Sequence, residues 1–133
     1  MKTIAVIQAR MLSHRLRGKT LMSVNGIPLL YRVIANAKEL PFIDDVIVAT
    51  TSLEADKPII AASQELGVKV VAGSSLNVLN RFIKASEDMD DNDVIMRLTA
   101  DNPILLTEVA EKLFNQMGAA DYISVSSISE DVT

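Results

Sequence analysis

The run Val46-Ile47-Val48-Ala49-Thr50-Thr51 decides the fold class of this 133-residue chain. Its first four residues are apolar without alternation, which is typical of a strand in a parallel sheet that is covered on both faces. Similar Val/Ile-rich runs predict further strands at residues 3–9, 68–71, 93–98 and 121–126. Between them, apolar side chains recur at helical spacing in residues 28–40, 56–66 and 108–117. Strands that alternate with helices predict an α/β domain with a doubly wound, mostly parallel sheet in three layers.

Length and composition fit a single domain that spans residues 1–133. Apolar residues make up 49% of the chain and charged residues 23%, which excludes a disordered protein. The N-terminal apolar stretch breaks at Gln8 and Arg10, so it predicts a first strand rather than a signal peptide, and no run approaches the ~20 residues that span a bilayer. The absence of cysteine excludes disulfides, and the single His14 argues against a zinc site. We therefore expect a cytoplasmic protein that does not act at a membrane.

One short segment carries a concentration of positive charge. The chain as a whole has a net charge of −4, which argues against general affinity for nucleic acid. Residues 10–19, the basic segment, nevertheless contain Arg10, Arg15, Arg17 and Lys19 and no acidic residue. A compact basic segment on an acidic protein indicates a localised anion site, with a solvated loop as the alternative.

The position of the basic segment in the predicted fold favours the anion site. Ligands of doubly wound sheets bind beyond the carboxyl ends of the strands, where the strand order reverses. If the order is 3-2-1-4, the crevice lies between the basic segment after strand 1 and residues 97–103 after strand 4. The second segment contains one acid, Asp101, whose alternative role is a turn or helix cap ahead of Pro103. Arginine and lysine neutralise phosphates, and Mg²⁺ binds one or two carboxylates with phosphate oxygens, so the crevice predicts a nucleoside triphosphate site with Asp101 as the metal ligand.

Several common catalytic motifs are missing from the sequence. The basic segment lacks the Gly-x-x-x-x-Gly-Lys-Ser/Thr of a Walker A loop and the Gly-x-Gly-x-x-Gly of dinucleotide folds. Neither a serine nucleophile elbow nor a Cys/His pair is present. Nucleotidyl transfer needs none of these motifs, because a substrate oxygen can attack the α-phosphate while cations and a metal ion stabilise the charge.

The residues after the first strand, Gln8-Ala9-Arg10-Met11-x-Ser13-x-Arg15-Leu16-x-Gly18-Lys19, resemble the signature of the spore coat polysaccharide biosynthesis protein F family. That family is a branch of the cytidylyltransferases, and the resemblance continues through residues 25–30, 47–51, 65–70, 73–74, 78–82, 97–103 and 120–122. It implies a Rossmann-like nucleotide-diphospho-sugar transferase fold of which the C-terminal part is missing. It also implies an enzyme that joins CTP to a sugar, giving a CMP-sugar for surface polysaccharide synthesis and pyrophosphate.

The resemblance assigns roles to individual residues. Arg10, Lys19 and Asp101 would be catalytic, and Asp101 would hold Mg²⁺. The expected nucleotide-binding residues are Ala9, Arg10, Ser13, Arg15, Lys19 and Thr99. A weaker set of expected substrate-binding residues is Thr50, Ser74 and Arg81. For this weaker set the alternative is that small or β-branched residues at strand ends only stabilise the fold.

Departures from the family pattern keep other functions open. Leu12 stands where the family has glycine, Arg17 where it has proline, and Asn102 where it has cysteine. If the position of Leu12 needs a positive φ, a leucine there would cost about 1–3 kcal/mol. The family also continues past residue 133 with a second metal-binding carboxylate. The alternatives are therefore a non-catalytic nucleotide-binding or dimerisation module, and a nucleotidyltransferase for another nucleoside triphosphate. Apolar surface left by a missing C-terminal layer would favour a homodimer.

Overall fold

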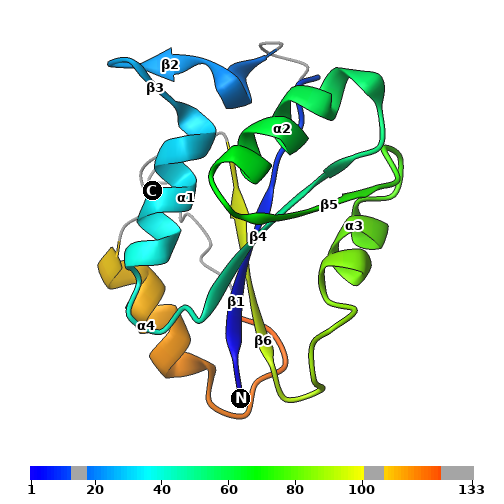
Figure 1. Ribbon diagram of the computed structural model, residues 1–133. Coiled ribbons are helices and arrows are strands. Elements are labelled where there is room, and N and C mark those ends of the chain that lie inside the picture. Colours follow the sequence, from blue (N-terminus) through cyan, green and yellow to red (C-terminus); the bar gives the residue numbers. More distant parts are fainter. Residues whose placement is uncertain (13–17, 101–106, 124–133) are drawn as a thin grey trace, which may run out of the picture.

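The sheet of this protein has four parallel strands in the order that the sequence predicts. In the computed structural model, which describes residues 1–12, 18–100 and 107–123, the sheet order is β5-β4-β1-β6 (Figure 1). The strands are β1 (Thr3–Gln8), β4 (Asp45–Thr51), β5 (Lys69–Gly73) and β6 (Val94–Thr99). Chain order reverses at β1, which lies between β4 and β6, so the predicted doubly wound sheet is confirmed.

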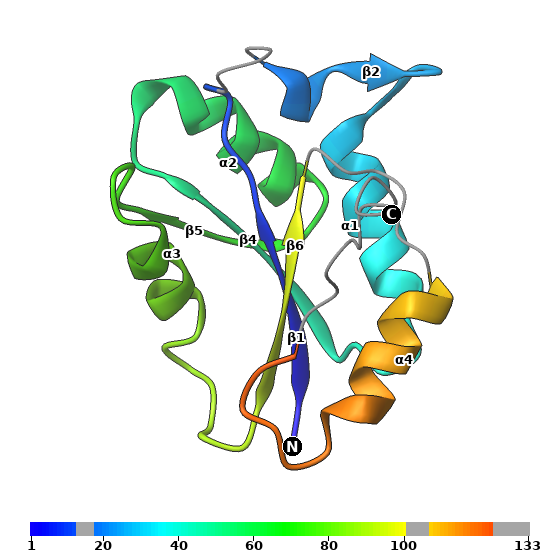
Figure 2. The same cartoon turned by 180° about the vertical axis from the view of Figure 1, so that it is seen from behind.

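Helices cover both faces of this sheet (Figure 1, Figure 2). They are α1 (Leu29–Glu39), α2 (Lys57–Glu65), α3 (Val78–Ala85) and α4 (Thr107–Met117). Helices α1 and α2 pack on one face and α3 packs on the other, which gives the three predicted layers. Helix α4 lies beside α1, where the Phe114 ring stacks on the Phe42 ring with centroids 4.5 Å apart.

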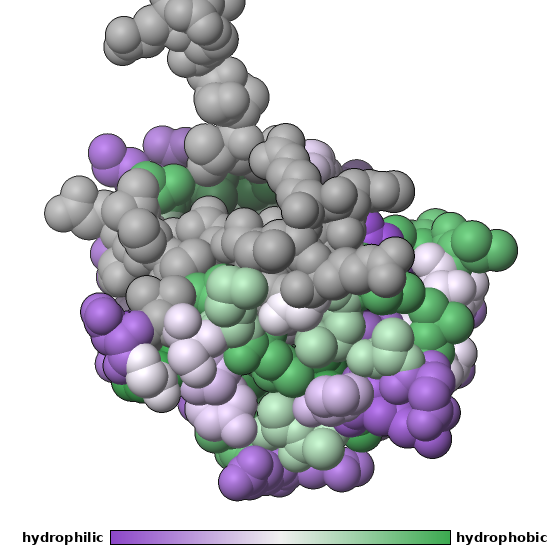
Figure 3. All heavy atoms as spheres, turned by 90° about the horizontal axis from the view of Figure 1, so that it is seen from above, coloured by the Kyte–Doolittle hydropathy of each residue, from purple (hydrophilic) through white to green (hydrophobic). Residues whose placement is uncertain are grey.

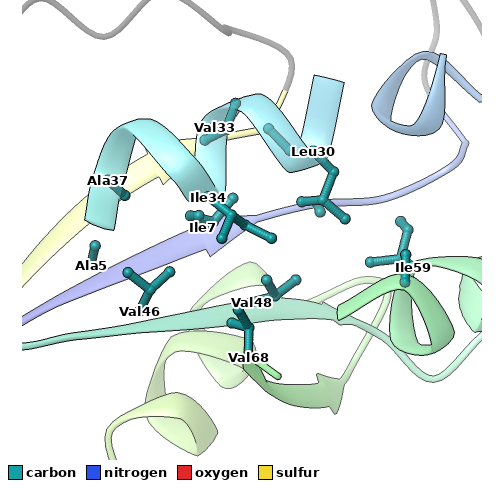
Figure 4. Close-up of a cluster of buried hydrophobic side chains, with 13 residues drawn as sticks. Ala5, Ile7, Leu30, Val33, Ile34, Ala37, Val46, Val48, Ile59 and Val68 are labelled. Carbon is teal, nitrogen blue, oxygen red and sulfur yellow. The ribbon is translucent and has the colours of Figure 1, made fainter. Parts of the chain in front are cut away.

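Two apolar cores hold the layers together, one on each face of β1 and β4. Because successive side chains of a strand point to opposite faces, Ile7 and Val48 meet α1 and α2, whereas Val6 and Ile47 face α3. Figure 4 shows the larger core, which contains Ala5, Ile7, Leu30, Val33, Ile34, Ala37, Val46, Val48, Ile59 and Val68. Fully burying a Val, Leu or Ile side chain stabilises a fold by about 1.5–3 kcal/mol, so this pattern fixes which face each helix covers.

Two elements differ from the sequence prediction. Helix α3 is eight residues long and begins after Asn77, whose side chain accepts a hydrogen bond from the Asn80 N–H at 3.2 Å. Its apolar residues recur at helical spacing, but over eight residues only, which is shorter than the window of about 11–18 residues in which this pattern is normally read. The predicted strand at 121–126 is wrong where the structure describes it, because residues 121–123 form no strand. Residues 124–126 lie outside the described residues.

Short elements stand above the carboxyl ends of the strands. The 3-10 helix η1 (Lys19–Leu21) and the hairpin of β2 (Ser23–Val24) and β3 (Ile27–Pro28) connect β1 to α1, and η2 (Glu54–Asp56) connects β4 to α2. Figure 3 looks onto this edge of the molecule and shows apolar and polar residues interspersed around it. No helix in the described part of the chain is long and apolar enough to cross a membrane.

Candidate active site

Strands β1 and β6 end side by side at the predicted crevice. Gln8 is the last residue of β1 and pairs with Thr99, the last residue of β6. The Ala9 N–H then donates to a β4 carbonyl at 3.0 Å, and the Ala100 N–H donates to the Gln8 carbonyl at 3.0 Å. Ala9 and Ala100 are buried, whereas Arg10 and Thr99 are exposed. Arg10 and Thr99, both predicted site residues, therefore lie together at the carboxyl end of the sheet.

The basic segment is closed at its base by two hydrogen bonds. The Gly18 N–H donates to the Met11 carbonyl at 2.7 Å, and the Thr20 hydroxyl donates to the Arg10 carbonyl at 2.9 Å. Gly18 has a φ of 75°, a left-handed conformation that glycine adopts without strain. These bonds hold the two ends of the segment, Arg10 and the backbone of Lys19, together at the end of β1.

Several predicted site residues lie outside what the structure describes. They are Ser13 and Arg15 in the basic segment, Asp101 after β6, and the side chain of Lys19. Leu12, which replaces a family glycine, is described, and its side chain is exposed. Among the non-glycine residues of the described ranges, positive φ occurs at Asn25, with 52°, and not at Leu12. The backbone strain considered for Leu12 is therefore absent.

A buried carboxylate that sequence reasoning missed holds the start of the basic segment. The Asp56 side chain is buried, and its Oδ1 accepts a hydrogen bond from the Met11 N–H at 2.7 Å. Its Oδ2 accepts from the Thr51 hydroxyl, and the Thr51 oxygen accepts from the Leu53 N–H at 3.2 Å. Asp56 precedes α2 like an ordinary N-cap, yet its side chain makes no capping hydrogen bond. Since Met11 is 45 residues away, no local pattern in the sequence reveals this contact.

Arg81, from the weaker predicted set, is buried without a hydrogen-bond partner. Its residue exposure is 0%, and none of its three guanidinium nitrogens is hydrogen-bonded within the ranges that the structure describes. Burial is the main cause that lowers the pKa of Arg81 below its ordinary value, and repulsion from Arg10 and Arg97 lowers it further. Attraction to Asp56 acts in the opposite direction. Arg81 thus belongs to a group of cations at this edge of the sheet.

Arg97 and Thr99 point to the same face of this edge. The Arg97 guanidinium lies 5.3 Å from the centre of the Phe82 ring on α3 and donates to Gln8 Oε1 at 3.0 Å. Thr99 is two residues further along β6, so its side chain points to the same face, and it is exposed. The α3 side of the crevice is therefore lined by polar groups from β1 and β6.

Thr50 and Ser74, the other two residues of the weaker set, have different surroundings. Thr50 is fully buried, and its hydroxyl oxygen has no partner among the described residues. The Ser74 hydroxyl oxygen accepts from the Leu76 and Asn77 N–H groups at 3.2 and 3.0 Å. Ser74 therefore stabilises the loop ahead of α3, which is the structural alternative considered for it. The Thr50 hydroxyl, in contrast, makes no hydrogen bond to a described residue.

Metal binding at this edge would rest on Asp101. The described side chains include no group of three or more His, Asp or Glu that could hold a metal ion. Both Asp56 carboxylate oxygens already accept hydrogen bonds, and Arg81 beside it is a cation. One carboxylate with phosphate oxygens and water is a ligand set that Mg²⁺ accepts, so Asp101 fits that role by its chemistry.

A hollow of 390 Å³ lies away from the crevice. It is lined mainly by apolar side chains near the start of β6, on α4 and in residues 121–123, including Ile95, Leu113 and Tyr122. The basic segment contributes nothing to it. The candidate active site is therefore the crevice at the carboxyl ends of β1 and β6 and not this hollow.

Comparison with known proteins identifies a family. The sequence matches the cytidylyltransferase family over residues 4–133. It is 36% identical over 110 residues to the spore coat polysaccharide biosynthesis protein SpsF of Bacillus subtilis, covering 80% of this chain and 45% of that protein. It is 34% identical over 114 residues to the 3-deoxy-manno-octulosonate cytidylyltransferase of Bdellovibrio bacteriovorus, covering 85% and 44%. The chain spans about half the length of the curated relatives that it matches.

A solved structure agrees with the sequence comparison. CMP:2-keto-3-deoxy-manno-octonic acid synthetase complexed with CTP superposes with a TM-score of 0.73 at 25% identity, covering 90% of this chain and 48% of that one. Its likeness supports the Rossmann-like α/β fold expected from the sequence. The chain therefore belongs to the cytidylyltransferase family, a family of nucleotidyltransferases.

Proposed function

We propose that this chain binds CTP in the crevice between β1 and β6 and transfers the cytidylyl group to a sugar, with release of pyrophosphate. The observation that carries the proposal is the closed base of the basic segment, which holds Arg10 and the backbone of Lys19 where the strand order reverses. Similarity to SpsF and to the octulosonate enzyme supports an acidic or amino sugar destined for surface polysaccharide.

The residues of this chain would act by charge and position. A sugar hydroxyl oxygen attacks the α-phosphate, and the bond from that phosphorus to the pyrophosphate oxygen breaks. Arg10 and Lys19 would neutralise the triphosphate, and each charge-assisted hydrogen bond contributes about 1.5–3 kcal/mol. Mg²⁺ held by Asp101 would supply further neutralisation of phosphate charge.

The remaining predicted residues would orient the nucleotide. Ala9 follows β1 directly and its side chain is buried in the larger core, so its contribution to nucleotide binding would come from its backbone. Ser13, Arg15 and Thr99 would donate hydrogen bonds to the phosphates and the nucleoside. Thr50 offers a buried hydroxyl that no described residue satisfies.

Calorimetric titration of the chain with CTP, UTP, GTP and ATP, each with and without Mg²⁺, tests this proposal. We expect CTP to bind most tightly and Mg²⁺ to strengthen its binding. Lys19→Ala should weaken CTP binding by about 10- to 100-fold, because a charge-assisted contact is lost. The matched control is Lys38→Ala, which removes an exposed lysine in the last turn of α1 and should leave CTP binding unchanged.

Three results would count against the proposal. A folded chain that binds no nucleotide would contradict the site itself. CTP binding without pyrophosphate release, in the presence of Mg²⁺ and an acidic or amino sugar, would indicate a non-catalytic nucleotide-binding module. Tighter binding of another nucleotide would move the proposal to a different nucleotidyltransferase specificity.

A further inference from the structure

We infer that Arg81, with Arg10 and Arg97 beside it, forms a second anion-binding position on the α3 side of the crevice, which takes an oxyanion of the substrate. This inference rests on the proposed function and extends it. The oxyanion is a phosphate of the nucleotide or the carboxylate of a sugar acid, since a planar guanidinium binds either with two parallel hydrogen bonds.

The unpartnered guanidinium of Arg81 is the first observation. An arginine side chain stays protonated in proteins, so burial leaves a full positive charge out of water. Folded proteins pair such charges or use them to bind ligands, because an isolated buried charge is strongly unfavourable. Arg81 is 0% exposed, yet Nε, Nη1 and Nη2 all lack a hydrogen-bond partner in the described part of the molecule. Three donor nitrogens, which carry five N–H groups between them, therefore lack an acceptor.

The neighbouring charges do not compensate Arg81. The groups whose charges act on it are two cations, Arg10 and Arg97, and one carboxylate, Asp56. Both Asp56 oxygens already accept hydrogen bonds from other groups. The local charge is thus positive, and a bound oxyanion would satisfy the free donors and remove the repulsion at the same time.

Packing of α3 keeps Arg81 in place. A Cβ atom on Gly73, at the end of β5, would lie 2.9 Å from Asn80 Oδ1 and 3.0 Å from Arg81 Cγ, so the backbone approaches α3 closely there. The Asn80 side chain is itself held, because Oδ1 accepts a hydrogen bond from the Ser74 N–H at 3.1 Å. The stem of Arg81 is therefore held by the close packing of α3 against the end of β5.

Arg81→Met tests the inference, because methionine keeps much of the side-chain length and removes the charge. Melting temperature is measured with and without inorganic pyrophosphate. Without ligand, Arg81→Met should melt at the same temperature as the wild type or higher, because an uncompensated buried charge is gone. Where the oxyanion is a nucleotide phosphate, the variant should lose most of the melting-temperature increase that pyrophosphate gives the wild type, and it should bind CTP about 10- to 100-fold more weakly. Lys38→Met, the matched control, should change neither.

A purely structural arginine predicts the opposite pattern. Arg81→Met would then melt at a lower temperature, and its response to pyrophosphate would equal that of the wild type. If Arg81→Met does not fold, Arg81→Lys keeps the charge and loses the guanidinium fork. We expect Arg81→Lys to retain the fold and to show a reduced response to pyrophosphate.

Two probes separate the sources of the oxyanion. Stabilisation by pyrophosphate that depends on Arg81 assigns the position to the nucleotide phosphates, and stabilisation by gluconate alone assigns it to a sugar carboxylate. Stabilisation by neither probe overturns the inference. CTP binding and gluconate stabilisation that are both equal in the wild type and Arg81→Met also overturn it while leaving the proposed function intact, whereas failure of the proposed function shows itself as unchanged CTP binding in Lys19→Ala.

Discussion

Asp56 accepts hydrogen bonds from two groups that are far apart in the sequence, the Met11 N–H and the Thr51 hydroxyl. Asp56→Ala would leave both donors buried without an acceptor, so we expect a loss of about 2–4 kcal/mol in the free energy of unfolding. CTP binding should weaken as well, because the start of the basic segment is released. Asp56→Asn keeps one acceptor for Met11 and should lose less on both counts. Urea unfolding and calorimetric titration measure the two effects.

Asp44→Asn provides a control at the amino ends of the strands, at the opposite end of the sheet from the crevice. The Asp44 carboxylate accepts a hydrogen bond from the Thr3 N–H at 2.7 Å, at the start of β1. Its substitution should change the unfolding free energy slightly and leave CTP binding as in the wild type. If Asp44→Asn and Asp56→Ala weaken CTP binding equally, the effect comes from general destabilisation and not from the contact with Met11.

The surroundings of Asp56 and Arg81 could not be predicted from the sequence, unlike those of Arg10 and Lys19. The place of Arg10 and Lys19 could be predicted, because a strand end and a concentration of charge are both local features. The Asp56 contact spans 45 residues and has no local signature. The burial of Arg81 results from the packing of α3 against β5, and neither its exposure nor its missing partners can be seen without that packing.

Among the elements, α3 and β5 approach each other most tightly at Gly73. Gly73→Ala would place a methyl group 2.9 Å from Asn80 Oδ1 and 3.0 Å from Arg81 Cγ, so α3 has to shift. We expect a loss of about 1–3 kcal/mol in unfolding free energy, as for other overpacked sites. The response of the melting temperature to pyrophosphate should fall in the same variant, because Arg81 moves with the helix. If neither the unfolding free energy nor the melting-temperature response to pyrophosphate changes, the added methyl group has displaced the Asn80 side chain only and α3 has not moved.

Prediction of the elements succeeded for all four strands of the parallel sheet. The run at 46–51 is strand β4 (Asp45–Thr51), because its continuous apolar pattern matches burial under two layers of helices. The run at 121–126 mixes polar and apolar residues, and residues 121–123 are not a strand although they line a hollow together with edge strand β6. Composition gives the preference of a segment for a strand, and burial between two layers decides more strongly whether a strand forms.

The whole molecule carries a net charge of −4, while Arg10, Arg81 and Arg97 gather at one edge of the sheet. A small polyanion such as CTP is attracted by these three arginines, whereas a long polyanion is also repelled by the acidic residues of the rest of the molecule. We expect CTP to bind more weakly when the NaCl concentration is raised from about 0.1 M to about 1 M, because the Debye length shrinks from about 10 Å to about 3 Å. Titrations across this range measure the slope, and the chain should pass unretained through a heparin column. Retention on heparin, or an affinity that salt does not alter, contradicts this electrostatic picture.

The hydrogen bonds that close the basic segment have a consequence for evolution. One joins the Gly18 N–H to the Met11 carbonyl, and the other joins the Thr20 hydroxyl to the Arg10 carbonyl, so neither bond uses a side chain from the residues between Met11 and Gly18. Substitutions between these fixed ends change the chemistry offered to a ligand without changing how the segment closes. Leu12 and Arg17, which differ from the family pattern, both stand in this interval. Selection can therefore explore new ligands there while the folding core stays under a separate and stricter constraint.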